Sequence, residues 1–321
     1  MTGSIEVMDA RDHFVLAAPS TAGAADLSLR IGALRLANPV MPASGCFGPE
    51  LGRLIPAREL GAAVTKTVFA GSRGGNLAHR LSEISAGMIN SVGIPSRGPA
   101  GYLERQHPAY VALGVPTIVS VGGHRPEEYA PLVDDLGDAG DAYELNVSCP
   151  NLDNDGVDIG ADPEAVARVV TSVRQVTDRP LIVKLPPMVS SIAECAQAAE
   201  STGADALCVS NSIPVMALGS VSHAPLLGNV IGGLSGAMIR PIVLRLVWLA
   251  SRATSIPVIA CGGIGDADDA LAYLSVGASA FQVGTANFSR PFAMVEIVRE
   301  LYRRCAESGA SSIQALLGDD E

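Results

Sequence analysis

Short apolar segments alternate along the chain with longer segments in which apolar residues recur every three or four positions. Eight short segments, each rich in Val, Ile or Ala, cover 39–43, 62–68, 116–121, 142–147, 180–185, 205–210, 256–261 and 279–283. Continuous apolar strands that alternate with helices predict a parallel sheet whose outer face is covered. Eight such units favour a closed (β/α)8 barrel, the TIM barrel, over an open doubly wound sheet.

Helix signals stand between these strands. Residues 162–177 begin with Asp162, a suitable N-cap, and Pro163, which is favoured at the first helical position. Similar helical patterns cover 190–202, 238–253, 266–276 and 291–307. Ahead of the first barrel strand, residues 27–37 alternate apolar and polar positions around Gly32, which predicts a β-hairpin.

Two segments interrupt the alternation: 69–110, rich in Gly, Pro and Arg, and 211–237, rich in Gly, Ser and Pro. Each follows a strand, so we expect inserted loops on the face where barrel enzymes carry their active sites. We therefore predict a poorly ordered N-terminal extension at 1–25, a single barrel domain at 26–310 and a C-terminal tail at 311–321.

Composition and charge narrow the function classes. The 321 residues are 48% apolar and carry a net charge of -11, which argues against binding to nucleic acid or to an anionic membrane surface. The six cysteines are scattered and form no Cys-x-x-Cys pair, so we predict no metal site and reduced thiols. The sequence carries no signal peptide and no stretch of about 20 apolar residues, which favours a cytoplasmic protein.

Polar residues and glycines stand at the ends of the predicted strands. These ends read Ala43-Ser44-Gly45, Lys66-Thr67, Ser120, Asn146, Lys184, Asn211-Ser212, Gly262-Gly263 and Gly284-Thr285. A buried lysine without a partner is costly, so Lys66 and Lys184 should each face a ligand or an acid. The glycines after strands seven and eight are typical of a phosphate site in barrels.

A flavin mononucleotide (FMN) uses all of these parts at once. Its phosphate would lie at strands seven and eight, and its ring over the middle strands, where Lys184 would stabilise the negative charge of the reduced ring. A planar substrate stacked on that ring would be held by four amide side chains, which donate and accept hydrogen bonds. These are Asn90, Asn146, Asn151 and Asn211.

The segment Glu144–Asn151 reads Glu-Leu-Asn-Val-Ser-Cys-Pro-Asn, the end of a buried strand followed by a thiol between two amides. Cys149 is a candidate nucleophile or proton carrier beside the substrate ring. The structural alternative is a core cysteine next to a turn. Its position after the fourth of eight strands favours the chemical role, and the flavin hypothesis makes Cys149 a proton carrier.

From about residue 27 to about residue 300 the chain resembles the class 1 dihydroorotate dehydrogenases, and most closely the class 1B catalytic subunit. The strings that carry the resemblance occur in family order. They are Asn38 to Gly45, Lys66-Thr67, Gly87 to Ile94, Asn146 to Asn151, Val183-Lys184-Leu185, Asn211-Ser212, Gly232 to Gly236, Gly262-Gly263-Ile264 and Gly284-Thr285.

The resemblance implies oxidation of (S)-dihydroorotate to orotate in de novo pyrimidine synthesis, with hydride passing to flavin N5 and the C5 proton to Cys149. Lys184 joins Cys149 in the catalytic set. The FMN contacts that the resemblance implies fall on Ala43, Ser44, Lys66, Thr67, Asn146, Lys184, Ser210, Gly236, Gly262, Gly263, Gly284 and Thr285. The implied substrate contacts fall on Lys66, Asn90, Val92, Gly93, Ile94, Asn146, Asn151, Asn211 and Ser212.

The resemblance also implies a homodimer and a partner subunit with FAD and an iron–sulfur centre that passes electrons to NAD. Class 1A, a homodimer that reduces fumarate, is the alternative. Three departures from the family pattern are Ser120, where an Asn is usual, Cys46 and the 95–97 loop. They leave open a paralogue that acts on another dihydropyrimidine, such as dihydrouracil, or on a related cyclic amide. A noncatalytic phosphate-binding barrel would leave Cys149 and Lys184 unexplained.

Overall fold

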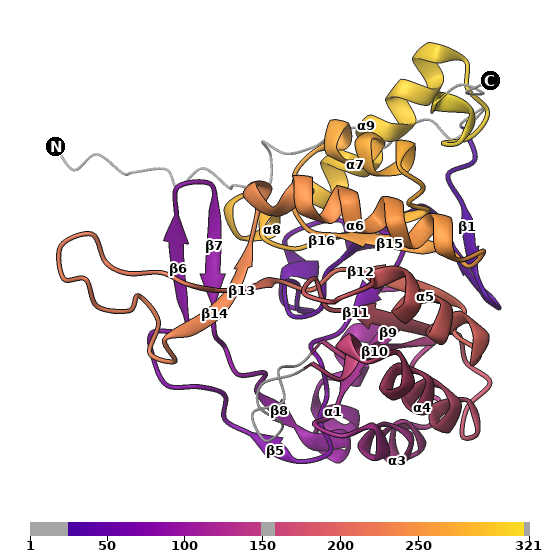
Figure 1. Cartoon of the computed structure of the whole chain (residues 1–321). Helices are drawn as coiled ribbons and strands as arrows, with labels where there is room; N and C mark the ends of the chain where they lie inside the picture. Colours follow the sequence, from indigo (N-terminus) through magenta and orange to yellow (C-terminus); the bar gives the residue numbers. More distant parts are fainter. Residues whose placement is uncertain (1–24, 149–157, 318–321) are drawn as a thin grey trace, which may run out of the picture.

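Eight parallel strands form the centre of the molecule. The computed structural model describes residues 25–148 and 158–317, and Figure 1 shows how their elements are arranged. The strand order is β3-β16-β15-β12-β11-β10-β9-β4, and the Gly61 N–H donates to the Val40 carbonyl at 2.8 Å, which joins the two outermost strands. The predicted (β/α)8 barrel is confirmed. Its strands are β3 (Val40–Pro42), β4 (Ala63–Val64), β9 (Thr117–Gly122), β10 (Ala142–Asn146), β11 (Leu181–Leu185), β12 (Ala206–Val209), β15 (Val258–Cys261) and β16 (Ala280–Val283).

Helices pack around the outside of these strands (Figure 1). The five that the sequence predicted are present as α4 (Pro163–Arg174), α5 (Ile192–Ser201), α6 (Arg240–Ala253), α7 (Ala267–Ser275) and α9 (Ala293–Ser308). The Asp162 side chain accepts a hydrogen bond from the Glu164 N–H at 2.9 Å, which confirms the predicted N-cap. The other α-helices are α1 (Gly98–Arg105), α2 (His107–Val111), α3 (Tyr129–Leu136) and α8 (Ala286–Ser289).

Alternate residues of each barrel strand belong to two separate apolar clusters. On β10, Tyr143 and Leu145 pack with helix residues such as Val166, whereas Ala142 joins the smaller cluster inside the barrel. This interior cluster is built from one side of every barrel strand, as expected for a side-chain period of two. The same parity directs Glu144 and Asn146 to the side of Ala142.

The predicted hairpin closes the amino-terminal end of the barrel. Strands β1 (Leu29–Ile31) and β2 (Leu34–Leu36) pair antiparallel, and Ile31, Leu34 and Leu36 pack into the interior cluster. Gly32 makes the turn with φ of +54°, a conformation that glycine adopts without strain. The hairpin therefore seals the end opposite the predicted site.

The two insertions contain regular structure that the sequence did not predict. A four-stranded antiparallel sheet of order β13-β14-β7-β6 extends from the barrel mouth (Figure 1). Its strands are β6 (Leu81–Ile84), β7 (Gly87–Asn90), β13 (Ile213–Met216) and β14 (Ile231–Ser235), and a second small sheet pairs β5 (Ser72–Arg73) with β8 (Ser96–Arg97). The sheet joins both insertions, which therefore contain strands as well as the predicted loops.

Among the helices of the described residues, none combines the length and apolar composition that a membrane crossing requires. The division into an extension at 1–25, a domain at 26–310 and a tail at 311–321 stays a prediction. The Asp26 N–H donates to the Ser311 carbonyl at 2.8 Å, so the start of the predicted domain contacts the first residue of the predicted tail.

Candidate active site

The carboxyl ends of the barrel strands bring most of the predicted site residues to one face. Ala43 follows β3 and its N–H donates to the Val283 carbonyl at 2.8 Å, which aligns this end with β16. Ser44 is the next residue and is partly exposed. Ser210 follows β12, is buried, and donates its N–H to the Cys261 carbonyl at 3.0 Å. The carboxyl ends of β3 and β12 are therefore aligned with those of β16 and β15.

A chain of hydrogen bonds links four polar side chains across this face. The hydroxyls of Ser120 and Thr67 lie 3.0 Å apart, and the Asn146 Nδ2 donates to Thr67 Oγ1 at 3.5 Å. The Asn146 Oδ1 accepts from Asn211 Nδ2 at 3.3 Å. These contacts fix which edge of each amide donates and which accepts. The departure at Ser120 therefore has a structural role, because its hydroxyl holds Thr67.

Lys184 meets an acid, as the sequence required of a buried lysine. Its side chain is 3% exposed, and its Nζ lies 3.8 Å from Glu144 Oε1 and 3.0 Å from Gln282 Oε1. Glu144 is fully buried and also accepts a short hydrogen bond from Gln282 Nε2. Burial lowers the pKa of Lys184, but the negative charges of Cys261 and Glu144 outweigh it, so that the pKa is raised overall. Sequence reasoning missed both Glu144 and Gln282.

Three cysteines surround this ion pair. Cys208 donates its Sγ hydrogen to Gln282 Oε1 at 3.3 Å, and the hydrogen bond between Cys208 and Cys261 lowers the pKa of Cys261 to about 7. Burial raises the pKa of Cys46 to about 11. Among residues 25–148 and 158–317, no cluster of His, Cys, Asp or Glu is arranged to hold a metal ion. The thiols are thus part of the packing around Lys184.

Lys66 lies against the backbone of Gly45. A Cβ at Gly45 would stand 2.8 Å from Lys66 Nζ, and Gly45 has φ of +81°. The positive φ favours glycine at position 45, and a Cβ there would also displace the lysine side chain. Lys66 is partly buried and follows β4, which places a cation at the strand ends as the sequence predicted.

The antiparallel sheet forms a second side of the candidate site, next to the strand ends of the barrel. Asn90 at the end of β7 donates from Nδ2 to the Gly233 carbonyl of β14 at 3.1 Å. A Cβ on Gly233 would lie 2.7 Å from Ser212 Cβ and 3.6 Å from Asn90 Nδ2. Gly233 therefore lets Asn90 and Ser212 approach each other, and Asn211 orients Ser212 by accepting its N–H at 2.8 Å.

The loop with Val92, Gly93 and Ile94 is held by a residue that sequence reasoning missed. Asn76 donates from Nδ2 to Ser91 Oγ at 2.8 Å, and its N–H donates to the Val92 carbonyl at 3.0 Å. Ile94 adopts φ of +43°, which is strained for a β-branched residue. Such strain is found at ligand-binding segments, where the surrounding structure enforces it.

The glycine-rich ends of the last two strands have a packing explanation of their own. Gly262 and Gly263 have φ of +140° and +73°, and a Cβ at Gly263 would stand 2.6 Å from Arg240 Cβ. Close by, Thr285 Oγ1 donates to Ser235 Oγ at 2.8 Å. Gly236 has φ of +103° and packs against Gly87, while a Cβ added at Gly284 would meet no atom closer than 3.6 Å.

The residues at these strand ends fit FMN. A fully buried ammonium stands at the middle strands, where a flavin ring that becomes negatively charged needs a cation. At the end of the last strand, the Thr285 hydroxyl stands beside Gly284, where an added Cβ would meet no atom closer than 3.6 Å, and this open backbone suits a phosphate. Two predicted residues, Cys149 and Asn151, lie outside the described residues.

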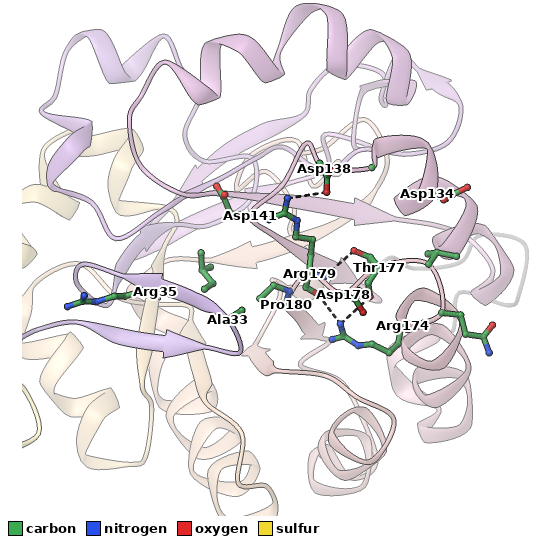
Figure 2. Close-up of a pocket in the computed structure, with 14 residues that line it drawn as sticks. Ala33, Arg35, Asp134, Asp138, Asp141, Arg174, Thr177, Asp178, Arg179 and Pro180 are labelled. Carbon is green, nitrogen blue, oxygen red and sulfur yellow. Dashed lines mark hydrogen bonds and ion pairs between the residues drawn. The ribbon is translucent and has the colours of Figure 1, made fainter.

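A cleft at the other end of the barrel is unsuited to this chemistry. It has a volume of about 730 Å³ and is lined by the hairpin and by residues that precede β10 and β11 (Figure 2). Two of its three arginines are already paired: Arg174 with Asp205 at 2.6 Å and Arg179 with Asp138 at 3.1 Å. In barrel enzymes this end carries stability, whereas the carboxyl ends of the strands carry the chemistry.

The fold and the site define a (β/α)8-barrel enzyme with its polar side chains at the strand ends. A family model described as "Dihydroorotate dehydrogenase" matches residues 26–305, and the chain therefore belongs to the dihydroorotate dehydrogenase family. It is an oxidoreductase with FMN as its cofactor.

Relatives of similar length carry one name, "Dihydroorotate dehydrogenase B (NAD(+)), catalytic subunit". The protein of Trichlorobacter lovleyi is 42% identical over 296 residues, which cover 91% of this chain and 97% of that protein. The protein of Geobacter sulfurreducens is 41% identical over 297 residues, with coverage of 91% and 97%. The protein of Bacillus pumilus is 40% identical over 296 residues, with coverage of 91% and 96%.

Proposed function

We propose that the chain oxidises (S)-dihydroorotate to orotate in de novo pyrimidine synthesis, as the catalytic subunit of a class 1B enzyme. The observation that carries the proposal is the position of the buried Lys184 ammonium, at the strand ends beside the linked amides of Asn146 and Asn211. The family membership and the name of the relatives support the substrate. They do not favour a dihydrouracil-like substrate.

The site residues divide into those for FMN and those for the substrate. When bound, FMN supplies the hydride acceptor. We assign its binding to Ala43, Ser44, Lys66, Thr67, Asn146, Lys184, Ser210, Gly236, Gly262, Gly263, Gly284 and Thr285. Lys184 contributes a preorganised positive charge, which costs no reorganisation when negative charge develops.

The substrate would lie between the barrel mouth and the antiparallel sheet. We propose that Asn90, Asn146, Asn211 and Ser212, together with Asn151 and the backbone of Val92 to Ile94, form hydrogen bonds with the amide edges of the substrate. Lys66 provides a cation for the carboxylate, which a chain of net charge -11 needs locally. Cys149 takes the C5 proton. A thiol with an ordinary pKa of about 8.5 works best as a base when removal of the proton is coupled to loss of the hydride.

We further propose two protein partners and a compartment. The name of the relatives, a catalytic subunit that uses NAD(+), supports a second subunit, which we propose carries FAD and an iron–sulfur centre. A second copy of the chain would form a homodimer. The scattered, unpaired cysteines of the described residues support a reducing compartment, the cytoplasm.

Two spectroscopic measurements test the proposal. Purified protein is expected to show flavin absorbance, or to take up FMN stoichiometrically. Under anaerobic conditions, dihydroorotate should bleach the bound flavin, whereas dihydrouracil should leave it oxidised. Bleaching by dihydrouracil alone would move the chain to the alternative substrate class, and absence of FMN uptake would refute the whole assignment.

A further inference from the structure

A charged pair is buried in the barrel interior directly beneath the predicted flavin site. The side chains of Glu144 and Lys184 are 0% and 3% exposed, and their nearest charged atoms are 3.8 Å apart. Gln282 bridges the two, because its Nε2 donates to Glu144 Oε2 and its Oε1 accepts from Lys184 Nζ at 3.0 Å. Glu144 Oε1 has no hydrogen-bond partner among the described residues.

This geometry is poor for stabilising the fold. A buried ion pair offsets the desolvation of its charges only with close contact and complete hydrogen bonding. Here the ion pair is long and one carboxylate oxygen lacks a hydrogen bond, so apolar side chains of similar size would hold the barrel at least as well. The presence of this ion pair is therefore better explained by a function of the Lys184 charge at the strand ends than by a contribution to the stability of the fold.

We propose that Glu144 is a positioning residue, whose carboxylate, held by Gln282, keeps the Lys184 ammonium charged at the strand ends before negative charge develops on the bound flavin. Reduction of the flavin then requires no proton uptake by Lys184. This inference rests on the proposed function, since it assigns FMN to the site above Lys184.

The other ionisable groups around Lys184 do not replace Glu144. They come from several elements: Cys208 on β12, Cys261 on β15 and Cys46 in the segment after β3, and Lys66 after β4 lies near Cys46. Burial raises the pKa of Cys46 to about 11 and raises the pKa of Cys208 as well, so both thiols are neutral near pH 7. Cys261, with a pKa lowered to about 7, is only partly ionised there. Lys66 adds a like charge, and Gln282 is neutral.

Glu144→Gln removes the charge and keeps the size of the side chain. The amide oxygen still accepts from Gln282 Nε2, while Lys184 loses the charge of Glu144, which together with Cys261 raises its pKa against the effect of burial. Under the proposal, Lys184 is then neutral beside the oxidised flavin and regains its proton on reduction. Each two-electron reduction therefore takes up one additional proton in the variant.

The midpoint potential of bound FMN, measured against pH, reports this proton directly. One additional proton per two electrons changes the reduction equilibrium tenfold per pH unit, or about 30 mV per pH unit for a two-electron couple. The measurement uses FMN-loaded wild type, Glu144→Gln and the matched control Glu59→Gln. Glu59 also forms an ion pair, with Arg299 at 2.7 Å, but precedes β4 and so belongs to the opposite end of the barrel.

The slope of the potential against pH should be steeper by about 30 mV per pH unit in Glu144→Gln and unchanged in Glu59→Gln. Parallel lines for all three proteins would overturn the role of Glu144 and leave the proposed function intact. A wild-type protein that takes up no FMN would instead overturn the proposed function. A merely structural role would weaken the binding of oxidised and reduced FMN equally and leave the slope unchanged.

A second measurement covers the case in which Glu144→Gln does not fold. Thermal unfolding is compared for Lys184→Met, Glu144→Leu and the double variant, because a double-mutant cycle isolates the coupling between the two charges. The double variant should melt above both single variants, since each single variant leaves one buried charge without its partner. If the two losses simply add, the charges are not coupled and the inference is overturned.

Discussion

Gly233→Ala tests whether the antiparallel sheet shapes the substrate site. Gly233 lies in β14 opposite Pro214 of β13 and Asn90 of β7. The added methyl would stand 2.7 Å from Ser212 Cβ, which is too close for a carbon–carbon contact and cannot be relieved by rotating the hydroxyl alone. Ser212 must therefore move together with Asn211, whose Oδ1 accepts the Ser212 N–H.

The expected magnitude follows from two lost hydrogen bonds. Ser212 and Asn211 are proposed to contact the substrate, and a typical hydrogen bond contributes about 1 kcal/mol. Loss of both weakens orotate binding by about 2 kcal/mol, which is roughly 30-fold in the dissociation constant. FMN binding should change little, because Gly233 is not among the assigned FMN contacts.

The assay is a titration of the FMN-loaded protein with orotate, followed by the change in the visible flavin spectrum. Gly71→Ala is the matched control, since a Cβ at Gly71 meets no atom within 4 Å. Both variants should bind FMN like the wild type. Orotate affinity in Gly233→Ala equal to that of Gly71→Ala would refute the reasoning that places the substrate against this sheet.

Two further substitutions probe the barrel away from the flavin contacts. Leu34→Ala truncates an 8% exposed side chain of the hairpin that closes the amino-terminal end of the barrel, and should lower the free energy of unfolding by about 2–5 kcal/mol. The melting temperature should fall while the affinity for FMN stays the same. An unchanged melting temperature would contradict the role of the hairpin in closing the barrel. Asp158 has one carboxylate oxygen without a hydrogen-bond partner among the described residues, and burial raises its pKa from 3.8 to about 6. The ionised form therefore destabilises the fold increasingly from pH 4 to 6 and fully above pH 6. Asp158→Asn should raise the melting temperature at neutral pH, with a gain that vanishes near pH 4, and a gain independent of pH would contradict this cause.

The barrel itself could be predicted from the sequence because each strand and helix has its own local pattern. The hairpin around Gly32 and the N-cap at Asp162 are local signals of the same kind. The antiparallel sheet has no such signal, since Asn90 and Gly233, which share one of its hydrogen bonds, are 143 residues apart. Its strands are short and rich in glycine, and only tertiary pairing defines them.

The sequence predicted that Lys184 faces an acid or a ligand, but not which residue that is. A lysine in an apolar strand requires an acid or a ligand, and Glu144 in another apolar strand requires a cation. Their pairing depends on the register of β10 with β11, which sets Asn146 opposite Lys184 and Glu144 opposite Ile182. That register is a tertiary property. The role of Cys149, outside the described residues, rests on the resemblance to the family alone.

Anaerobic single turnover of the FMN-loaded protein with (S)-dihydroorotate tests the central claim most directly. Without an electron acceptor, each bound FMN can take one hydride. We predict that the flavin bleaches completely and that one orotate is formed per bound FMN. Bound flavin that stays oxidised with excess dihydroorotate, with no orotate formed, would contradict the account.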